Sequence, residues 1–114
     1  MRDCEIYDLN GIAICRAKVA ERFKERLVGL LRHKELEPGR GLLLRGCSQV
    51  HTFGMRFTID VVFISKDLNI LEIERSLKPG RVSRYVKGAY WALELGSGAA
   101  ENLRTNDAIV LNML

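Results

Sequence analysis

The segment from Cys47 to Ile64 reads CSQVHTFGMRFTIDVVFI, and its second half carries the strongest strand signal in the chain. Side chains alternate between the two faces of a strand, so one face receives five apolar side chains: Met55, Phe57, Ile59, Val61 and Phe63. The opposite face begins with Arg56, Thr58 and Asp60 and continues with Val62 and Ile64. This pattern predicts a half-exposed strand that becomes buried on both faces, with Asp60 at the change.

Two carboxylates, Asp60 and Glu94, lie within otherwise apolar strand patterns. A buried carboxylate needs hydrogen-bond donors or a cation, because burying it unpaired costs several kcal/mol. A structural role is the favoured reading for each: Asp60 capping a turn or pairing with an arginine, and Glu94 pairing with an arginine. The alternative is a role in a site, either in binding or as a general acid–base couple.

The chain has 114 residues, of which 47% are hydrophobic and 28% charged, which predicts one domain with an ordinary core over residues 1–114. The net charge is +4 and the pI is about 9.2, which favours anionic partners. Positive and negative charges are mixed along the chain, and this argues against a dedicated nucleic-acid binder. The three cysteines are odd in number and widely spaced, so neither a disulfide framework nor a metal site is predicted.

The first residues contain no apolar leader segment, and no stretch approaches 18 apolar residues. We therefore expect a soluble cytoplasmic protein without membrane contact, unless a leader has been removed. No cofactor is predicted, because the sequence contains no phosphate-binding glycine-rich loop, no Cys-x-x-Cys pair and no nucleophile elbow. The sequence does not indicate the oligomeric state.

Further strands are predicted over residues 4–8, 12–19, 42–44, 70–74, 89–95 and 109–114. Asn10-Gly11 predicts a two-residue type I′ turn between the first two strands. Apolar residues at helical spacing predict a helix from Ala20 to Arg32, and Ser97 or Gly98 could cap a short late helix that ends at Leu103. The expected fold is mainly β, with α+β possible: a small antiparallel barrel or sandwich of about seven strands with an early helix and a short late helix.

From Ala20 to Val110 the chain resembles the family known as domain of unknown function 192. The resemblance rests on motifs that are weak singly and specific together: Arg26-x-x-Gly29-Leu30, Gly41-Leu42-Leu43-Leu44, His51-Thr52-x-Gly54-Met55, Ile59-Asp60-x-x-Phe63, Pro79-x-Arg81, Leu93-Glu94-Leu95 with Gly98, and Asn106-Asp107. It implies a compact, mainly β fold with an early helix. It implies no reaction.

Two positions depart from that family pattern. Many members carry an aromatic-Met-Lys-Asn-Thr version of the central motif, where this chain has His51 to Arg56, so ligand contacts of that version do not carry over. Glycine is usual before the late aspartate, where this chain has Asn106. Asparagine tolerates the left-handed backbone region better than most residues, so we expect the turn to be kept.

The leading functional hypothesis is a domain that binds a small anionic ligand or a protein partner. Its site would combine the His51–Asp60 segment with the Pro79–Arg81 loop and Glu94. The basic residues Lys78, Arg81, Arg84 and Lys87 form either a solvated loop, which is the simpler reading, or the rim of an anion site with Tyr85 available for stacking. The candidate ligand-binding residues are His51, Thr52, Met55, Arg56, Asp60, Arg81 and Glu94.

Two other classes of function stay open. A hydrolase or isomerase would use Asp60 or Glu94 with His51, which requires the carboxylate and the imidazole to lie within hydrogen-bond reach. A nucleic-acid accessory protein is the weaker alternative, and its binding would depend on salt.

Overall fold

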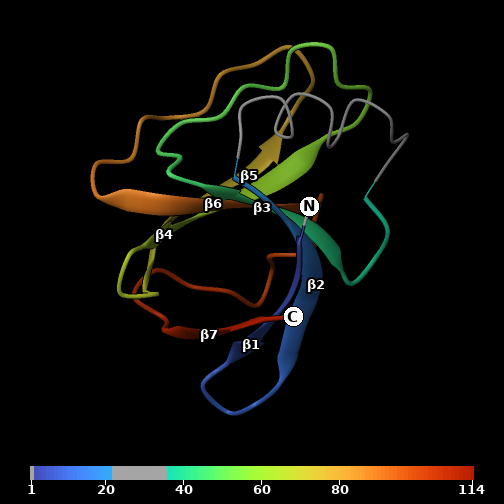
Figure 1. Cartoon of the computed structure of the whole chain (residues 1–114). Coiled ribbons are helices and arrows are strands. Elements are labelled where there is room, and N and C mark those ends of the chain that lie inside the picture. The colour runs from blue at the N-terminus through green and yellow to red at the C-terminus, as the bar shows by residue number, and fades with distance from the viewer. Residues whose placement is uncertain (1, 22–35) are drawn as a thin grey trace.

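The structure, a computed structural model, describes residues 2–21 and 36–114 (Figure 1). Within these residues the chain forms seven strands: β1 (Arg2–Asp8), β2 (Ala13–Ala20), β3 (Arg40–Arg45), β4 (Ile59–Ser65), β5 (Ile70–Leu77), β6 (Ala89–Gly96) and β7 (Ile109–Met113). The predicted number of strands and their approximate positions are confirmed.

All seven strands belong to one sheet with the order β5-β4-β6-β3-β2-β1-β7. The sheet curls into a half-barrel, as Figure 1 shows, and is not divided into the two layers of a sandwich. Its two edge strands approach each other at one point, where Asn69, just before β5, bridges Ala108, just before β7. The mainly β prediction is confirmed, and of its two architectures the structure takes the barrel-like one.

The expectation of a wholly antiparallel sheet was wrong at one pair of strands. β2 and β3 run parallel, with Arg16 opposite Arg40 and Ala20 opposite Leu44. Parallel neighbours need a crossover connection of about a dozen residues or more, and residues 21–39 separate the two strands in sequence. Short-range turn signals do not reveal such a connection.

The turn between β1 and β2 is not the predicted type I′ turn. Only Gly11 has a positive φ, at 80°, whereas type I′ requires positive φ at both central residues. The Gly11 amide donates to the Asp8 carbonyl at 3.1 Å, and the Asp8 carboxylate accepts from the amides of Asn10 and Ile12. The aspartate side chain thus stabilises a longer turn, with glycine in the left-handed position after it.

The predicted early helix falls on residues 20–32, and most of that range lies outside the described residues; Ala20 itself ends β2. The predicted late helix was wrong, because residues 97–102 form successive turns. The amides of Gly98 and Ala100 donate to Asp60, and Arg75 binds the carbonyls of Ala100 and Leu103. Side chains from β4 and β5 therefore bind the backbone of this segment, whose own hydrogen bonds are those of turns, such as Glu101 N to Gly98 O and Leu103 N to Ala100 O.

The core lies on both faces of the curled sheet. The inner face packs residues such as Ile6, Val19, Leu43, Val62 and Leu93. The outer face packs a second cluster around Leu42, Leu44, Val61 and Phe63. Residues 59–64 of β4 are all buried, which confirms the predicted double-sided strand.

The strand begins at Ile59 and not at Met55, so the expected period of two holds only for its second half. Met55 and Phe57 nevertheless pack, partly buried, against the same outer cluster as Ile59, Val61 and Phe63. The apolar pattern therefore predicts the buried face correctly even where the backbone is not a strand.

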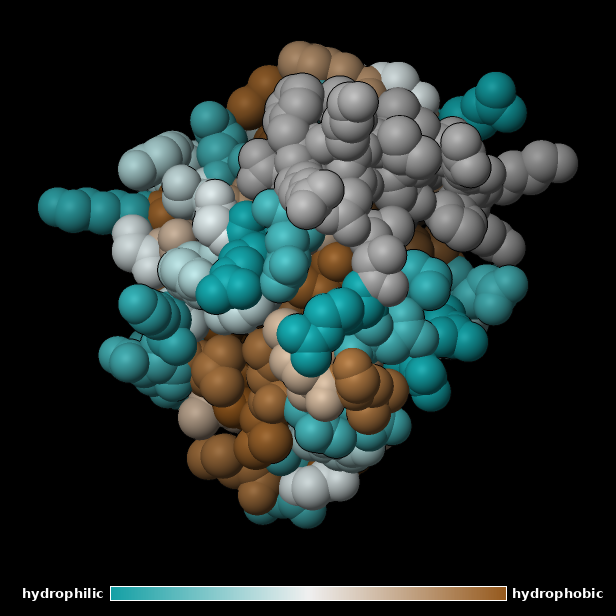
Figure 2. All heavy atoms as spheres, viewed as in Figure 1, coloured by the Kyte–Doolittle hydropathy of each residue, from teal (hydrophilic) through white to brown (hydrophobic). Residues whose placement is uncertain are grey.

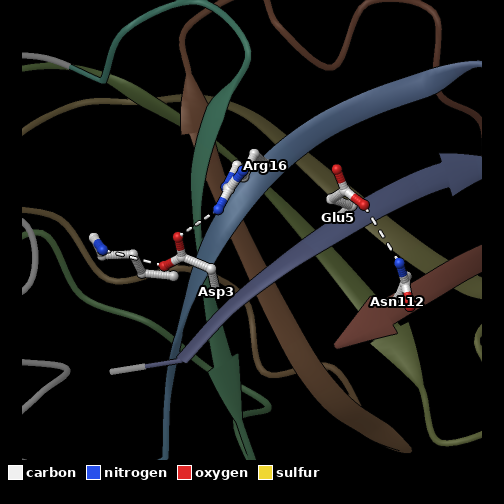
Figure 3. A network of polar contacts seen from close by, with 5 residues as sticks. Asp3, Glu5, Arg16 and Asn112 are labelled. Carbon is white, nitrogen blue, oxygen red and sulfur yellow. Dashed lines mark hydrogen bonds and ion pairs between the residues drawn. The ribbon is translucent and has the colours of Figure 1, made fainter. Parts of the chain in front are cut away.

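Polar contacts hold the outward side of β1 to its neighbours (Figure 3). Asp3 accepts from Arg16 at 3.0 Å and from Lys18 at 3.1 Å, and Asn112 on β7 donates to Glu5 at 3.3 Å. Hydrogen bonds from Lys18 and then Arg16 lower the pKa of Asp3. Arg16, Lys18 and Asn112 are exposed and the two carboxylates are only partly buried, so these pairs add little stability.

The three cysteines are buried. Burial raises the pKa of Cys4 to about 11 and that of Cys15 to about 12, so both thiols stay neutral at ordinary pH. In the residues that the structure describes, no helix has both the length and the apolar character that spanning a membrane requires.

Candidate functional site

Two segments that are distant in sequence lie side by side: residues 48–54, before β4, and residues 78–86, between β5 and β6. We call them the loop pair. Backbone hydrogen bonds join them from Thr52 N to Arg81 O, from Ser83 N to Val50 O and from Val86 N to Ser48 O, each 2.8 Å long. The loop pair brings the central motif beside the basic Pro79–Arg81 loop.

Thr52 is the buried clamp of the loop pair. Its Oγ1 donates to the Lys78 carbonyl at 2.6 Å and accepts from the Arg81 amide at 2.9 Å. Its carbonyl accepts from the Gly80 amide at 3.0 Å. With no exposed surface, Thr52 positions residues 78–81 and cannot itself face a ligand in solution.

Asp60 is also buried, and its carboxylate accepts three backbone N–H groups. Oδ1 accepts from Ser76 at 2.9 Å, and Oδ2 accepts from Gly98 at 3.0 Å and Ala100 at 3.2 Å. Ser76 lies where the β4–β5 register shifts and has a φ of 54°. Asp60 therefore pairs the backbone N–H groups of an irregular strand end and of a turn, which is the capping role expected of it.

A groove of about 400 Å³ runs along the end of β5 and the first part of the 78–86 segment. Four cationic side chains and one carboxylate contribute to it. Its lining residues are Ile73, Glu74, Arg75, Ser76, Leu77, Lys78, Arg81, Val82 and Arg84. Cationic side chains therefore outnumber carboxylates in the lining, and we call this feature the basic groove.

The four cations of the basic groove differ in how they are engaged. Arg84 pairs with Glu72 at 2.7 Å, and this contact raises the pKa of Arg84. Arg75 donates to two carbonyls, those of Ala100 at 2.7 Å and Leu103 at 2.9 Å. Lys78 and Arg81 form no ion pair within residues 2–21 and 36–114. Their charge is available to a ligand.

The predicted site residues do not all converge. Arg81 lines the basic groove. Thr52 and Asp60 do not line it but accept hydrogen bonds from the amides of two lining residues, Arg81 and Ser76. His51 is exposed, bridges Val82 in the loop pair and stacks on Phe53, with the ring centroids 4.9 Å apart. Met55 packs in the outer cluster, and Arg56 is exposed outside the groove lining.

Glu94 and Asp60 lie on opposite faces of the sheet. Asp60 alternates with Val61, so it shares the inner face with Val62, whereas Glu94 shares the outer face with Ala92. The two carboxylates therefore do not form a general acid–base couple. Both oxygens of Asp60 are engaged by amides, and His51 Nδ1 accepts from the Phe53 amide at 3.3 Å. This geometry gives no support to an enzyme built on these residues.

Sequence reasoning missed Arg75 and the apolar part of the groove lining. Arg75 follows the alternating Leu71 to Glu74 pattern and looked like the end of a strand, although β5 continues to Leu77. The register of β5 with β4 shifts near Ser76, in the strand end that lines the groove, and no residue-type pattern signals that shift. The described part of the chain contains no group of three or more His, Cys, Asp or Glu side chains placed to hold a metal ion.

A curled seven-strand half-barrel with a loop pair beside its edge strand defines the structural class. The family model for DUF192, described as uncharacterized ACR, matches residues 6–111. The chain therefore belongs to the DUF192 family, as its motifs indicated. No curated protein matches it.

Solved structures show the same fold. A protein from Sinorhizobium meliloti 1021, described as a "putative transcription regulator", is similar with a TM-score of 0.77 and 20% identity, over 96% of this chain and 92% of that chain. A protein of unknown function from Novosphingobium aromaticivorans DSM 12444 also has a TM-score of 0.77, with 16% identity over 95% of this chain and 83% of that chain. At these identities the likeness concerns the fold alone.

Proposed function

We propose that the chain is a binding domain for an anionic ligand or partner, with its site in the basic groove. The observation that carries the proposal is the charge of that groove: it is lined by Arg75, Lys78, Arg81 and Arg84, opposed by Glu74 in the lining and by Glu72, which pairs with Arg84. A concave surface with one sign of charge concentrates ligands of the opposite sign.

Two of the four cations have partners within the described residues, and two do not. Arg75 is bound by two carbonyls and Arg84 by Glu72, so both guanidinium groups already have partners within the chain. Lys78 and Arg81 project from a loop whose backbone Thr52 clamps, and both side chains are exposed. Because this backbone is already held in place, binding of an anion costs side-chain entropy but little backbone entropy.

The size of the groove also fits a ligand. Its volume of about 400 Å³ lies within the range of roughly 300–1,000 Å³ that is usual for ligand sites. Small phosphate or carboxylate compounds and the acidic segment of a larger partner share the chemistry that this surface recognises.

The test measures binding of three anionic probes at low salt by calorimetry or fluorescence anisotropy: inorganic pyrophosphate, a hexaglutamate peptide and the oligonucleotide dT12. We expect at least one probe to bind and the Lys78→Ala/Arg81→Ala variant to bind it about tenfold more weakly or worse. The melting temperature of that variant should stay close to that of the wild type, because neither side chain has an internal partner among the described residues.

The matched control is Arg40→Ala. Arg40 is exposed at the start of β3, which β6 and β4 separate from β5 in the sheet. This control removes a positive charge from elsewhere on the surface and should change binding less than twofold. Absence of binding for all three probes, or an equal loss in the control, would contradict an anion site in the basic groove.

A further inference from the structure

Three large apolar side chains are exposed on the loop pair, whose 78–86 segment lines one side of the basic groove. Phe53 is 54% exposed, Val82 52% and Tyr85 67%. Val82 lines the groove, His51 opposite it stacks on Phe53, and Tyr85 follows the groove residue Arg84. Single exposed apolar residues are ordinary, but two aromatic rings beside four cations form a distinct combination.

The other exposed apolar side chains lie elsewhere. Leu9 and Ile12 belong to the β1–β2 turn, and Val110 and Leu114 to β7 and the residue after it. Figure 2 shows hydrophobic surface in the lower part of that view, where Figure 1 draws β7 and the β1–β2 turn. That surface has no cationic groove among its residues, and nothing in the structure indicates what would cover it.

The two exposed rings lie at opposite ends of the loop pair. Phe53 directly follows Thr52, which pairs with Arg81, whereas Tyr85 precedes Val86, which pairs with Ser48. About four residues along an extended chain separate these ends, or about 13 Å at roughly 3.3 Å per residue. The single base of a mononucleotide would not reach both rings, whereas successive bases of a strand would.

We infer that the anionic partner is a single-stranded nucleic acid. Its phosphates would bind Lys78 and Arg81, with Arg75 and Arg84 behind them, and its bases would stack on Phe53 and Tyr85. This inference rests on the proposed function and adds the class of ligand. Positive grooves bordered by exposed aromatic rings bind single strands in this way, because every base has a face that stacks on a ring.

The exposed rings favour a nucleic acid over an acidic peptide. A carboxylate-rich peptide would use the cations and gain nothing specific from Phe53 or Tyr85, whereas unpaired bases gain stacking at both. The mixed charge along the sequence argued against a dedicated nucleic-acid binder. In the fold, by contrast, four cations line one groove, and the loop pair that forms one side of this groove carries two exposed rings.

The experiment compares two oligonucleotides with the same number of phosphates: fluorescein-labelled dT12 and a 12-mer of abasic residues. Anisotropy titrations would be made with the wild-type chain and with Phe53→Ala, Tyr85→Ala and Leu9→Ala. We expect dT12 to bind about tenfold more tightly than the abasic strand, and Phe53→Ala and Tyr85→Ala to lose about fivefold or more for dT12 only. Leu9→Ala removes an equally exposed apolar residue, 70% exposed, from the β1–β2 turn and should have no effect.

Salt dependence gives a second readout. For single strands log K falls with log salt with a slope of about −0.7 per phosphate contact, so two to four contacts predict a slope of roughly −1.4 to −2.8. Lys78→Ala/Arg81→Ala should make this slope shallower, and Phe53→Ala should leave it unchanged.

The outcomes separate this inference from the proposed function. Equal binding of dT12 and the abasic strand, with both weakened by Lys78→Ala/Arg81→Ala, would overturn base stacking and keep the anion site. Tighter binding of hexaglutamate than of dT12 would assign the groove to an acidic protein segment instead. If neither oligonucleotide binds while pyrophosphate does, the ligand is a small anion and the nucleic-acid inference fails.

Discussion

Asp60 and Thr52 are buried side chains whose polar atoms bond to backbone groups of other segments. Asp60 accepts amides from β5 and from the turns after β6, and Thr52 joins the two members of the loop pair. Asp60 therefore binds β5 at the point where its register with β4 shifts, and Thr52 holds residues 78–81 in place. The roles that the structure gives these two motif residues are hydrogen bonds to backbone N–H and C=O groups.

Replacing Asp60 with alanine should destabilise the protein strongly. Three amides would lose a charged acceptor, and one of them, the buried Ala100 amide, would be left without a partner at a cost of about 1–3 kcal/mol. We expect a loss of about 3 kcal/mol or more in the free energy of unfolding, measured by urea denaturation. Asp60→Asn, which keeps the shape, should also lose stability, and a wild-type midpoint for it would show that the carboxylate is not needed as an acceptor.

Replacing Thr52 with valine should cost about 2 kcal/mol, since the Lys78 carbonyl and the Arg81 amide lose their shared partner. Thr52→Ser keeps the hydroxyl and serves as the control. Hydrogen exchange would locate the effect, with faster exchange expected at the Arg81 amide in Thr52→Val alone. Unchanged exchange in both variants would refute the clamp.

At the scale of single residues the sequence predicts that Asp60 needs donors, because a carboxylate between apolar neighbours cannot be left unpaired. It does not predict which donors, because the amides of Ser76, Gly98 and Ala100 become neighbours only through sheet pairing and a register shift. Asn106 was expected to keep a left-handed turn in place of glycine, and its φ of 73° confirms this.

Strands β3 and β6 approach closely at Gly41, and this contact depends on the missing side chain. A Cβ atom at Gly41 would lie 2.9 Å from Leu95 Cδ2, 3.1 Å from the Glu94 carbonyl oxygen and 3.2 Å from Leu93 Cδ1. The inner face of the half-barrel thus has no room for a side chain at position 41. Glycine is required there by close packing and not by a positive φ.

Gly41→Ala should therefore destabilise the sheet by about 1–3 kcal/mol, the usual cost of overpacking a core. Gly39→Ala probes the other kind of glycine, because its φ of 78° demands the left-handed region while nothing lies within 4 Å of its added Cβ. Urea unfolding of both variants measures the difference. If a second substitution that shortens Leu95, such as Leu95→Val, fails to recover any of the Gly41→Ala loss, crowding at this contact is not the cause.

At the scale of elements, apolar alternation and turn residues locate every strand, because each strand buries at least one face. They do not give the order β5-β4-β6-β3-β2-β1-β7 or the parallel β2–β3 pair, since pairing depends on contacts between distant segments. The prediction of a late helix was wrong for the same reason, because contacts with distant segments decide the structure of residues 97–102. Local capping residues favoured it, but in the fold Asp60 and Arg75 from other strands bind the backbone of this segment in a series of turns.

The whole molecule keeps two thiols, Cys4 and Cys15, inside its curled sheet, and this makes its stability sensitive to alkaline pH. Burial raises the pKa of Cys4 from an ordinary 9.0 to about 11 and that of Cys15 to about 12. The folded state therefore holds protons that the unfolded chain releases once the pH exceeds about 9.

This contribution to stability is complete below pH 9 and is lost as the pH rises toward 11 and 12. Urea midpoints should fall between pH 8 and pH 10.5, and they should fall less in Cys4→Ala/Cys15→Ala. A thiol reagent at pH 8 should label Cys4 and Cys15 only after unfolding. Rapid labelling in the folded protein, or an identical pH dependence in the double variant, would contradict burial as the cause.

At the scale of the whole molecule, composition and charge indicate a basic globular chain that favours anions, but not where the charge gathers. The basic groove combines Arg75 from the end of β5 with Lys78, Arg81 and Arg84 from the adjoining loop. The last three form one basic stretch in the sequence, and for that reason the sequence pointed to this loop. Arg75 joins them only because β5 lies at the edge of the sheet and ends in a shifted register.

Because β1 pairs with β7, one edge of β1 has no partner until the ribosome has synthesised the last strand. Cys4 faces Met113 across that pair, more than a hundred residues later. At about 5–20 residues per second, roughly 5–20 s of translation pass between the two strands. During that interval β1 exposes a row of unpaired backbone groups to neighbouring nascent chains, so the final strand shields the first one from misassembly as well as completing the fold.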